Sequence, residues 1–141
     1  MTTRRKPAVP RAPAKAARRP VRSTKRGTSL ADVRAMALAL PGSEELPHHK
    51  YTSFRVRGRI YATAPPEGGF LHVFVDEATR AAAIGLAPES AEALHWGAKV
   101  VGVRLNLALV SAARVERLLE QAWTMRAPKA VVAARAASVV A

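Results

Sequence analysis

The sequence of 141 residues contains no cysteine. Disulfide bonds, thiolate nucleophiles and zinc sites built on cysteine are therefore excluded. Aromatic residues make up only 5% of the chain, so any core must consist mainly of aliphatic side chains. No apolar run reaches the length of about 18 residues that a membrane-spanning helix requires, and we expect no membrane partner.

Acidic residues are missing from residues 1–28, which contain ten lysines or arginines. These cations account for most of the formal net charge of +13. They are Arg4, Arg5, Lys6, Arg11, Lys15, Arg18, Arg19, Arg22, Lys25 and Arg26. A segment so charged, with several prolines and no aromatic residue, buries too little apolar surface to offset the entropy of ordering it. We therefore predict a disordered basic arm over residues 1–28, whose natural partner is a polyanion.

The arm lacks the features of a targeting signal. A secretory signal peptide needs an apolar segment after its basic residues, and none follows here. A transit peptide must form an amphipathic helix, which the prolines at positions 7, 10, 13 and 20 would break. We therefore predict a cytoplasmic protein.

The remaining sequence alternates between strand and helix patterns. Alternating apolar residues between turn signals predict strands at residues 51–56, 60–64, 70–75 and 99–105. Apolar residues at three- and four-residue spacing, each run preceded by a capping residue, predict helices at 30–40 and 77–84 and a last helix that follows the cap Ser111 and runs to about residue 126. Residues 43–50 are polar and contain Pro47, which predicts a loop. Residues 86–94 are predicted to form a loop or a short helix.

The order of these elements predicts an α+β fold, with helices packed on one face of an antiparallel sheet. Short turns separate the first three strands, which indicates an antiparallel meander over residues 51–75. We expect one domain over residues 29–128. An Ala- and Val-rich tail over residues 129–141 then either continues the last helix after a break or frays.

Two stretches of the sequence resemble a known family. They are Leu40-Pro41-Gly42 with Glu44-Glu45, and the run from Ser53 to Ala62, which reads SFRVRGRIYA. Together with Gln121-Ala122-Trp123 and Ala127-Pro128-Lys129, they are similar to the bacterial MmcQ/YjbR proteins over about residues 29–130. The resemblance implies a two-layer CyaY-like fold, also described as a double wing, and a DNA-binding role. It implies no catalytic residues.

The basic residues predict contacts with nucleic acid, in particular duplex DNA. The ten cations of the arm are expected to contact phosphates, which gives affinity without sequence readout. Lys50, Arg55, Arg57 and Arg59 lie on or beside a predicted hairpin whose tip could sit against phosphates as a wing. Arg104 joins them if the fourth strand pairs nearby. The alternative is a solvated outer face of the sheet, with an arm that only solubilises the protein.

Metal and enzyme chemistry find little support in the sequence. His48 and His49 have no acidic or histidine partner at helical spacing, so we predict no metal site. No phosphate-binding loop, dinucleotide fingerprint or nucleophile elbow is present, and we predict no cofactor and no enzymatic activity. The second hypothesis for function is a protein-interaction or small-ligand-binding module.

Overall fold

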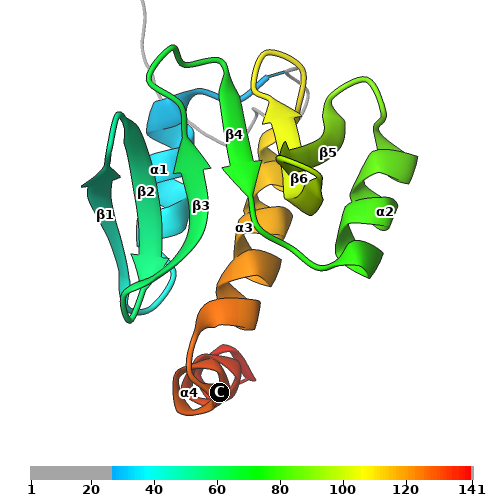
Figure 1. The fold of residues 1–141 in the computed structure, drawn as a ribbon. Coiled ribbons are helices and arrows are strands. Elements are labelled where there is room, and N and C mark those ends of the chain that lie inside the picture. The colour runs from blue at the N-terminus through cyan, green and yellow to red at the C-terminus, as the bar shows by residue number, and fades with distance from the viewer. Residues whose placement is uncertain (1–26, 141) are drawn as a thin grey trace, which may run out of the picture.

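The computed structural model describes residues 27–140, with side chains described to residue 137, and shows an α+β fold (Figure 1). Ten of the predicted DNA-binding residues, from Arg4 to Arg26, lie outside the described residues. Within the described chain the order of elements is α1 (Leu30–Leu38), β1 (Ser43–His48), β2 (Tyr51–Val56), β3 (Arg59–Ala64), β4 (Phe70–Val73), α2 (Glu77–Leu86), β5 (Ala91–Trp96), β6 (Lys99–Asn106), α3 (Ala112–Arg126) and α4 (Lys129–Val140).

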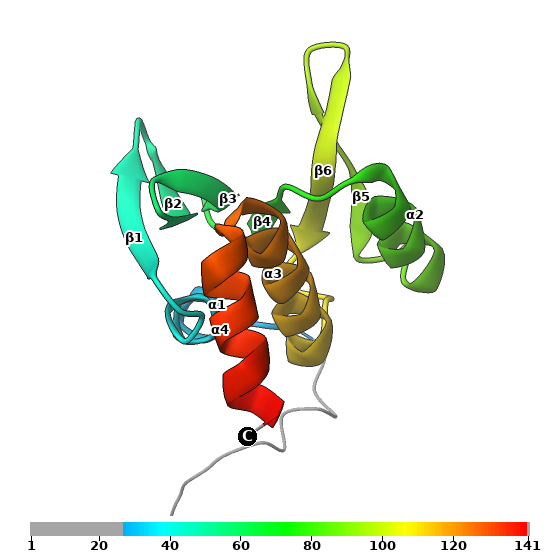
Figure 2. The same cartoon turned by 90° about the horizontal axis from the view of Figure 1, so that it is seen from below.

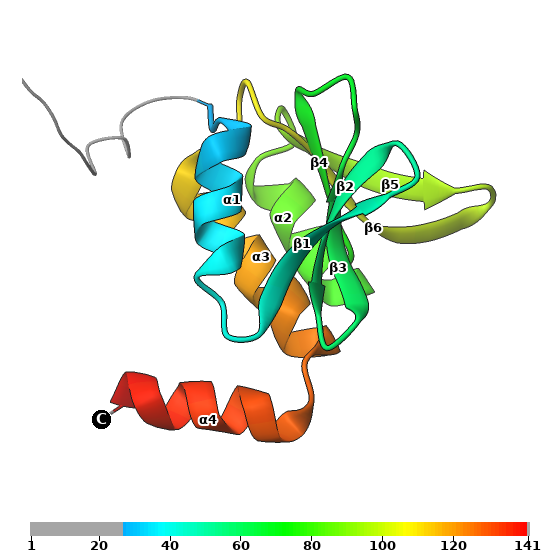
Figure 3. The same ribbon diagram turned by 90° about the vertical axis from the view of Figure 1, so that its left-hand side faces the viewer.

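The strands form one antiparallel sheet in the order β1-β2-β3-β4-β6-β5. Helices α1, α2 and α3 lie on the same face of this sheet, and none of the helices in the described chain covers the other, open face (Figure 3). The predicted α+β class, the one-sided helical layer and the meander of β2, β3 and β4 are therefore confirmed. The hairpin of β5 and β6 projects away from the helices (Figures 2 and 3).

Two segments were predicted wrongly, and both form edge strands of the sheet. Residues 43–50 are mostly strand β1, because Ser43 to His48 pair with β2 along its whole length. Residues 86–94 contain the start of β5, which pairs with β6 at the opposite edge. An edge strand has only one neighbour and tolerates polar residues and proline, so Pro47 does not prevent β1 from forming.

The core lies between the sheet and α1 and α3. Its largest fully buried side chains include Trp123 of α3, Tyr61 of β3 and Phe54 of β2. The indole Nε1 of Trp123 donates a hydrogen bond of 2.9 Å to the Pro41 carbonyl, which ties α3 to the end of α1. Trp123 thus meets both requirements of a buried tryptophan, apolar contact and a partner for its N–H.

The described chain is anchored from its first residues. Thr28 is buried, its amide donates to the Leu107 carbonyl at 2.7 Å, and its hydroxyl donates to the Val110 carbonyl at 2.8 Å. Gly27 has a φ of 93°, and a Cβ there would lie 2.9 Å from the Ala108 carbonyl oxygen. Packing therefore starts at the junction that the sequence places between arm and domain.

After Pro128 the chain forms the separate helix α4, as one of the two alternatives for the tail predicted. Arg135 of α4 forms an ion pair of 2.6 Å with Glu120 of α3, and its guanidinium lies 5.7 Å from the Trp123 ring centroid. Val131 and Val132 pack against the core. These contacts hold α4 against the end of α3.

Candidate nucleic-acid interface

The predicted cations of the folded domain are divided between the two ends of β2. Lys50 occupies the turn between β1 and β2, whereas Arg57 and Gly58 form the turn between β2 and β3. β2 has six residues, so these turns lie about 20 Å apart. Arg57 has a φ of 51°, which a two-residue hairpin turn requires. The fold therefore does not bring Lys50 together with the arginines of the second turn.

Arg55 is held by neighbouring groups of β1 and β2. Its Nε donates to the Ser53 hydroxyl at 3.0 Å, and its Nη2 is 3.5 Å from the Pro47 carbonyl. Its Cα partner across the strand pair is Glu44. Part of the hydrogen-bonding capacity of this guanidinium is thus already used, and a carboxylate-bearing residue lies beside it.

Arg59 joins the second turn to the end of α3. Its Nη1 donates to the carbonyl of Arg126 at 3.3 Å, and Arg126 is the last residue of that helix. Arg57 and Arg59 flank Gly58, and Arg59 contacts the backbone of Arg126. We refer to Arg57, Arg59 and Arg126 together as the arginine cluster. Arg126 was not predicted from the sequence. Its contact with Arg59 joins residues 67 positions apart, and no local sequence pattern indicates such a contact.

Arg104 does not join this cluster. It lies in β6, which β3 and β4 separate from β2. Its Nη1 forms an ion pair of 2.8 Å with Glu92, and its guanidinium lies 3.6 Å from the centroid of the Phe70 ring. These contacts balance its charge and fix its position, so it adds little to a phosphate-binding surface.

His72 lies beside Arg104 in the sheet, since the two are Cα partners of β4 and β6. It is buried, and its Nε2 has no hydrogen-bond partner among the described residues. Burial lowers the pKa of His72 below its ordinary value of 6.5, and the nearby Arg104 charge lowers it further, while Glu67 opposes the shift. The imidazole is therefore neutral at pH 7 and contributes no charge to the open face.

The stability of the fold should fall in mild acid because of His72. Its pKa is lower in the folded than in the unfolded chain, so below pH 6.5 the unfolded chain binds more protons and the free energy of unfolding decreases. We expect the urea midpoint to be lower at about pH 5 than at about pH 7.5, and the difference to shrink in His72→Gln. An equal pH dependence in both proteins would contradict this assignment.

A hollow of about 160 Å³ opens beside the arginine cluster. It is lined by His48, Ile60, Thr63, Phe74, Trp96, Val101 and Arg126. Trp96 is 61% exposed, and its ring meets that of Phe74 edge to face at a centroid distance of 5.3 Å. The buried Nε of Arg126 has no partner within residues 27–140. The hollow thus combines an exposed aromatic ring with a guanidinium that has unused hydrogen-bonding capacity.

The histidine pair at the β1–β2 turn does not form part of a larger ligand set. The rings of His48 and His49 lie 4.7 Å apart, centroid to centroid. No group of three histidine, cysteine or carboxylate side chains within residues 27–140 is arranged to hold a metal ion. In the same part of the chain, no helix has the length and apolarity needed to cross a membrane.

A one-sided helical layer on a six-stranded antiparallel sheet defines a small α+β domain. The YjbR family model matches residues 38–125, so the chain belongs to the YjbR family, and the predicted resemblance is confirmed. A crystal structure of Deinococcus radiodurans protein DR2400, with a DUF419 domain, is similar in fold. It has a TM-score of 0.61 and 22% sequence identity, over 73% of this chain and 80% of that one. Among curated proteins no significant match is found.

Proposed function

We propose that this YjbR protein binds duplex DNA in the cytoplasm, mainly through phosphates and with little sequence preference. The observation that carries the proposal is the segregation of charge along the chain. Residues 1–26 contain ten cations and no acid, whereas the rest of the chain has almost balanced charge. Such a segment attracts a polyanion by releasing the counterions condensed on it.

The arginine cluster supplies a second point of contact in this proposal. Arg57 is exposed in its turn, and Arg59 is oriented by its bond to the Arg126 carbonyl. Phosphate contacts from a rigid turn fix the orientation of a protein on DNA, even where they carry no sequence information. The arm thus supplies most of the affinity, and the cluster positions the domain. No catalytic step is part of the proposal.

The proposal is tested by the salt dependence of binding to a fluorescent duplex, measured by anisotropy. If about six to ten phosphates are contacted, the plot of log K against log salt should have a slope of about −5 to −9. Arg57→Gln should weaken binding uniformly across duplex sequences, by about threefold, and reduce the steepness of the slope by about 1.

The matched control is Arg34→Gln, which also removes one positive charge. Arg34 already forms an ion pair of 2.9 Å with Glu45, so its loss should change neither the affinity nor the slope appreciably. A duplex affinity that is insensitive to salt would contradict phosphate binding and favour docking on an apolar surface instead.

A further inference from the structure

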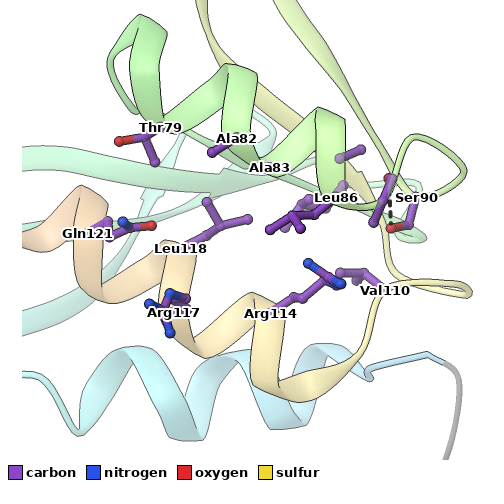
Figure 4. A pocket seen from close by; sticks show the side chains of 13 residues that line it. Thr79, Ala82, Ala83, Leu86, Ser90, Val110, Arg114, Arg117, Leu118 and Gln121 are labelled. Atoms are coloured by element: carbon purple, nitrogen blue, oxygen red, sulfur yellow. Dashed lines mark hydrogen bonds between the residues drawn. The ribbon is translucent and has the colours of Figure 1, made fainter.

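A second cavity, of about 250 Å³, lies between α2, α3 and the sheet (Figure 4). Leu105 and Ala91 of the sheet and Leu118 of α3 form apolar walls, and the buried residues Val110 and Ala87 also line the cavity. The cavity exists because α2 carries small side chains here. Its sequence EATRAAAIGL presents Ala82 and Ala83 to the cavity, and no residue of α2 is fully buried.

The mouth of the cavity is positively charged. Arg114 and Arg117 lie one turn apart on α3, so both side chains fall on one side of the helix. Figure 4 shows the Arg114 guanidinium reaching from α3 toward Leu86, with Gln121 further along the same helix. None of the 13 residues that line the cavity is acidic. Leu86, at the rim, is 68% exposed.

The two arginines have no carboxylate partner in the part of the chain that the structure describes. The ion pairs there involve Arg34, Arg104 and Arg135 only. The segment 1–26 contains no acidic side chain that could neutralise them, and its ten cations would be repelled by the mouth. A ligand that fits must therefore combine an anionic group with an apolar tail.

We propose that this cavity binds a small amphiphilic anion, specifically a free medium-chain carboxylate. Its carboxylate would accept charge-assisted hydrogen bonds from Arg114 and Arg117, because guanidinium groups match carboxylates in geometry. Its tail would lie between α2 and the sheet and cover Leu86. At about 30 Å³ for each heavy atom, the volume admits a tail of about eight carbons. The site is independent of the proposed DNA surface.

Calorimetric titration of the full-length protein with straight-chain carboxylates tests this proposal. Affinity should rise about fourfold for each methylene from butanoate to octanoate, because each one leaves water for an apolar wall. Beyond about eight to ten carbons the increase should stop, because the cavity is full. Octylammonium, which has the same tail and the opposite charge, should not bind.

Two variants test separately the binding of the carboxylate head group and the binding of the apolar tail. Arg114→Gln together with Arg117→Gln should lower octanoate affinity about tenfold. The matched control Arg80→Gln removes a cation of α2 that does not line the cavity, and should leave the affinity unchanged. Ala83→Leu fills the cavity and should abolish binding, with the melting temperature measured to show that the fold is retained.

Because the arm could attract carboxylates without the cavity, octanoate binding that survives the double arginine variant would overturn the proposal. Equal binding of octanoate and octylammonium would overturn it too, as would a concentration-dependent dimer in sedimentation that Ala83→Leu abolishes. If Ala83→Leu unfolds the protein, the chemical shifts of methyl groups in the parent protein test whether octanoate occupies the cavity. Octanoate must then shift the Leu86, Leu105 and Leu118 methyls of the parent protein, and a failure to do so contradicts the site.

Discussion

Duplex DNA affinity is expected to fall at least about tenfold at low salt when residues 1–26 are removed, and the salt slope should flatten markedly. The truncation removes ten of the 23 lysines and arginines and no acid, so the formal net charge falls from +13 to +3. The new chain should begin at Gly27, because Thr28 is bonded to Leu107 and Val110 and belongs to the fold. Anisotropy titrations at about 50 and 200 mM salt measure both quantities.

A matched control keeps the composition and charge of the arm and changes only the order of its residues. If contacts are made to phosphates alone, a chain whose residues 2–26 are permuted should bind duplex DNA as the parent does. Replacing the ten arm cations by glutamine should reproduce the truncation. Equal affinity of the truncated and full-length proteins would assign binding to the domain alone, and the proposed role of the arm would be wrong.

The inner strands of the sheet could be predicted because the sequence patterns that indicate them are local. Strands β2, β3, β4 and β6 each have neighbours on both sides, and their patterns show in the sequence. The predicted cap Ser111 and the end of α3 at Arg126 agree with the structure. The missed strands are the two edges of the sheet, β1 and β5, where one-sided pairing relaxes the requirement for apolar alternation.

Side-chain environments that depend on distant contacts could not be predicted. Arg55, Arg57 and Arg59 look alike in the sequence, yet one bonds within its strand pair, one occupies a turn and one binds the end of α3. The cavity between α2 and α3 was missed for a related reason. Alanines on one face of a helix are compatible both with close packing and with an empty cavity. Only the distance between α2 and α3 decides which of the two is present.

Gly102→Ala should be the most destabilising small substitution in the sheet. Gly102 of β6 lies against the backbone at the end of β4, and a Cβ there would be 2.1 Å from the Val73 carbonyl oxygen and 2.9 Å from the Phe74 Cα. Backbone atoms cannot rotate away as a side chain can, so the methyl group must separate β4 from β6. We expect the free energy of unfolding to fall by about 3 kcal/mol, measured by urea denaturation.

Gly85→Ala is the matched control, because the same methyl group is added where no atom lies within 4 Å. Gly85 is inside α2, and alanine restricts the unfolded chain more than glycine does, so stability should rise by about 0.5–1 kcal/mol. If the free energy of unfolding falls in Gly102→Ala and rises in Gly85→Ala, a general effect of replacing glycine by alanine is excluded. Since β4 joins the β1–β2–β3 half of the sheet to β6 and β5, Gly102→Ala should also loosen the open face, including the contact of Phe74 with Trp96. A urea midpoint equal to that of the parent would contradict the close approach of Val73 and Phe74 to Gly102.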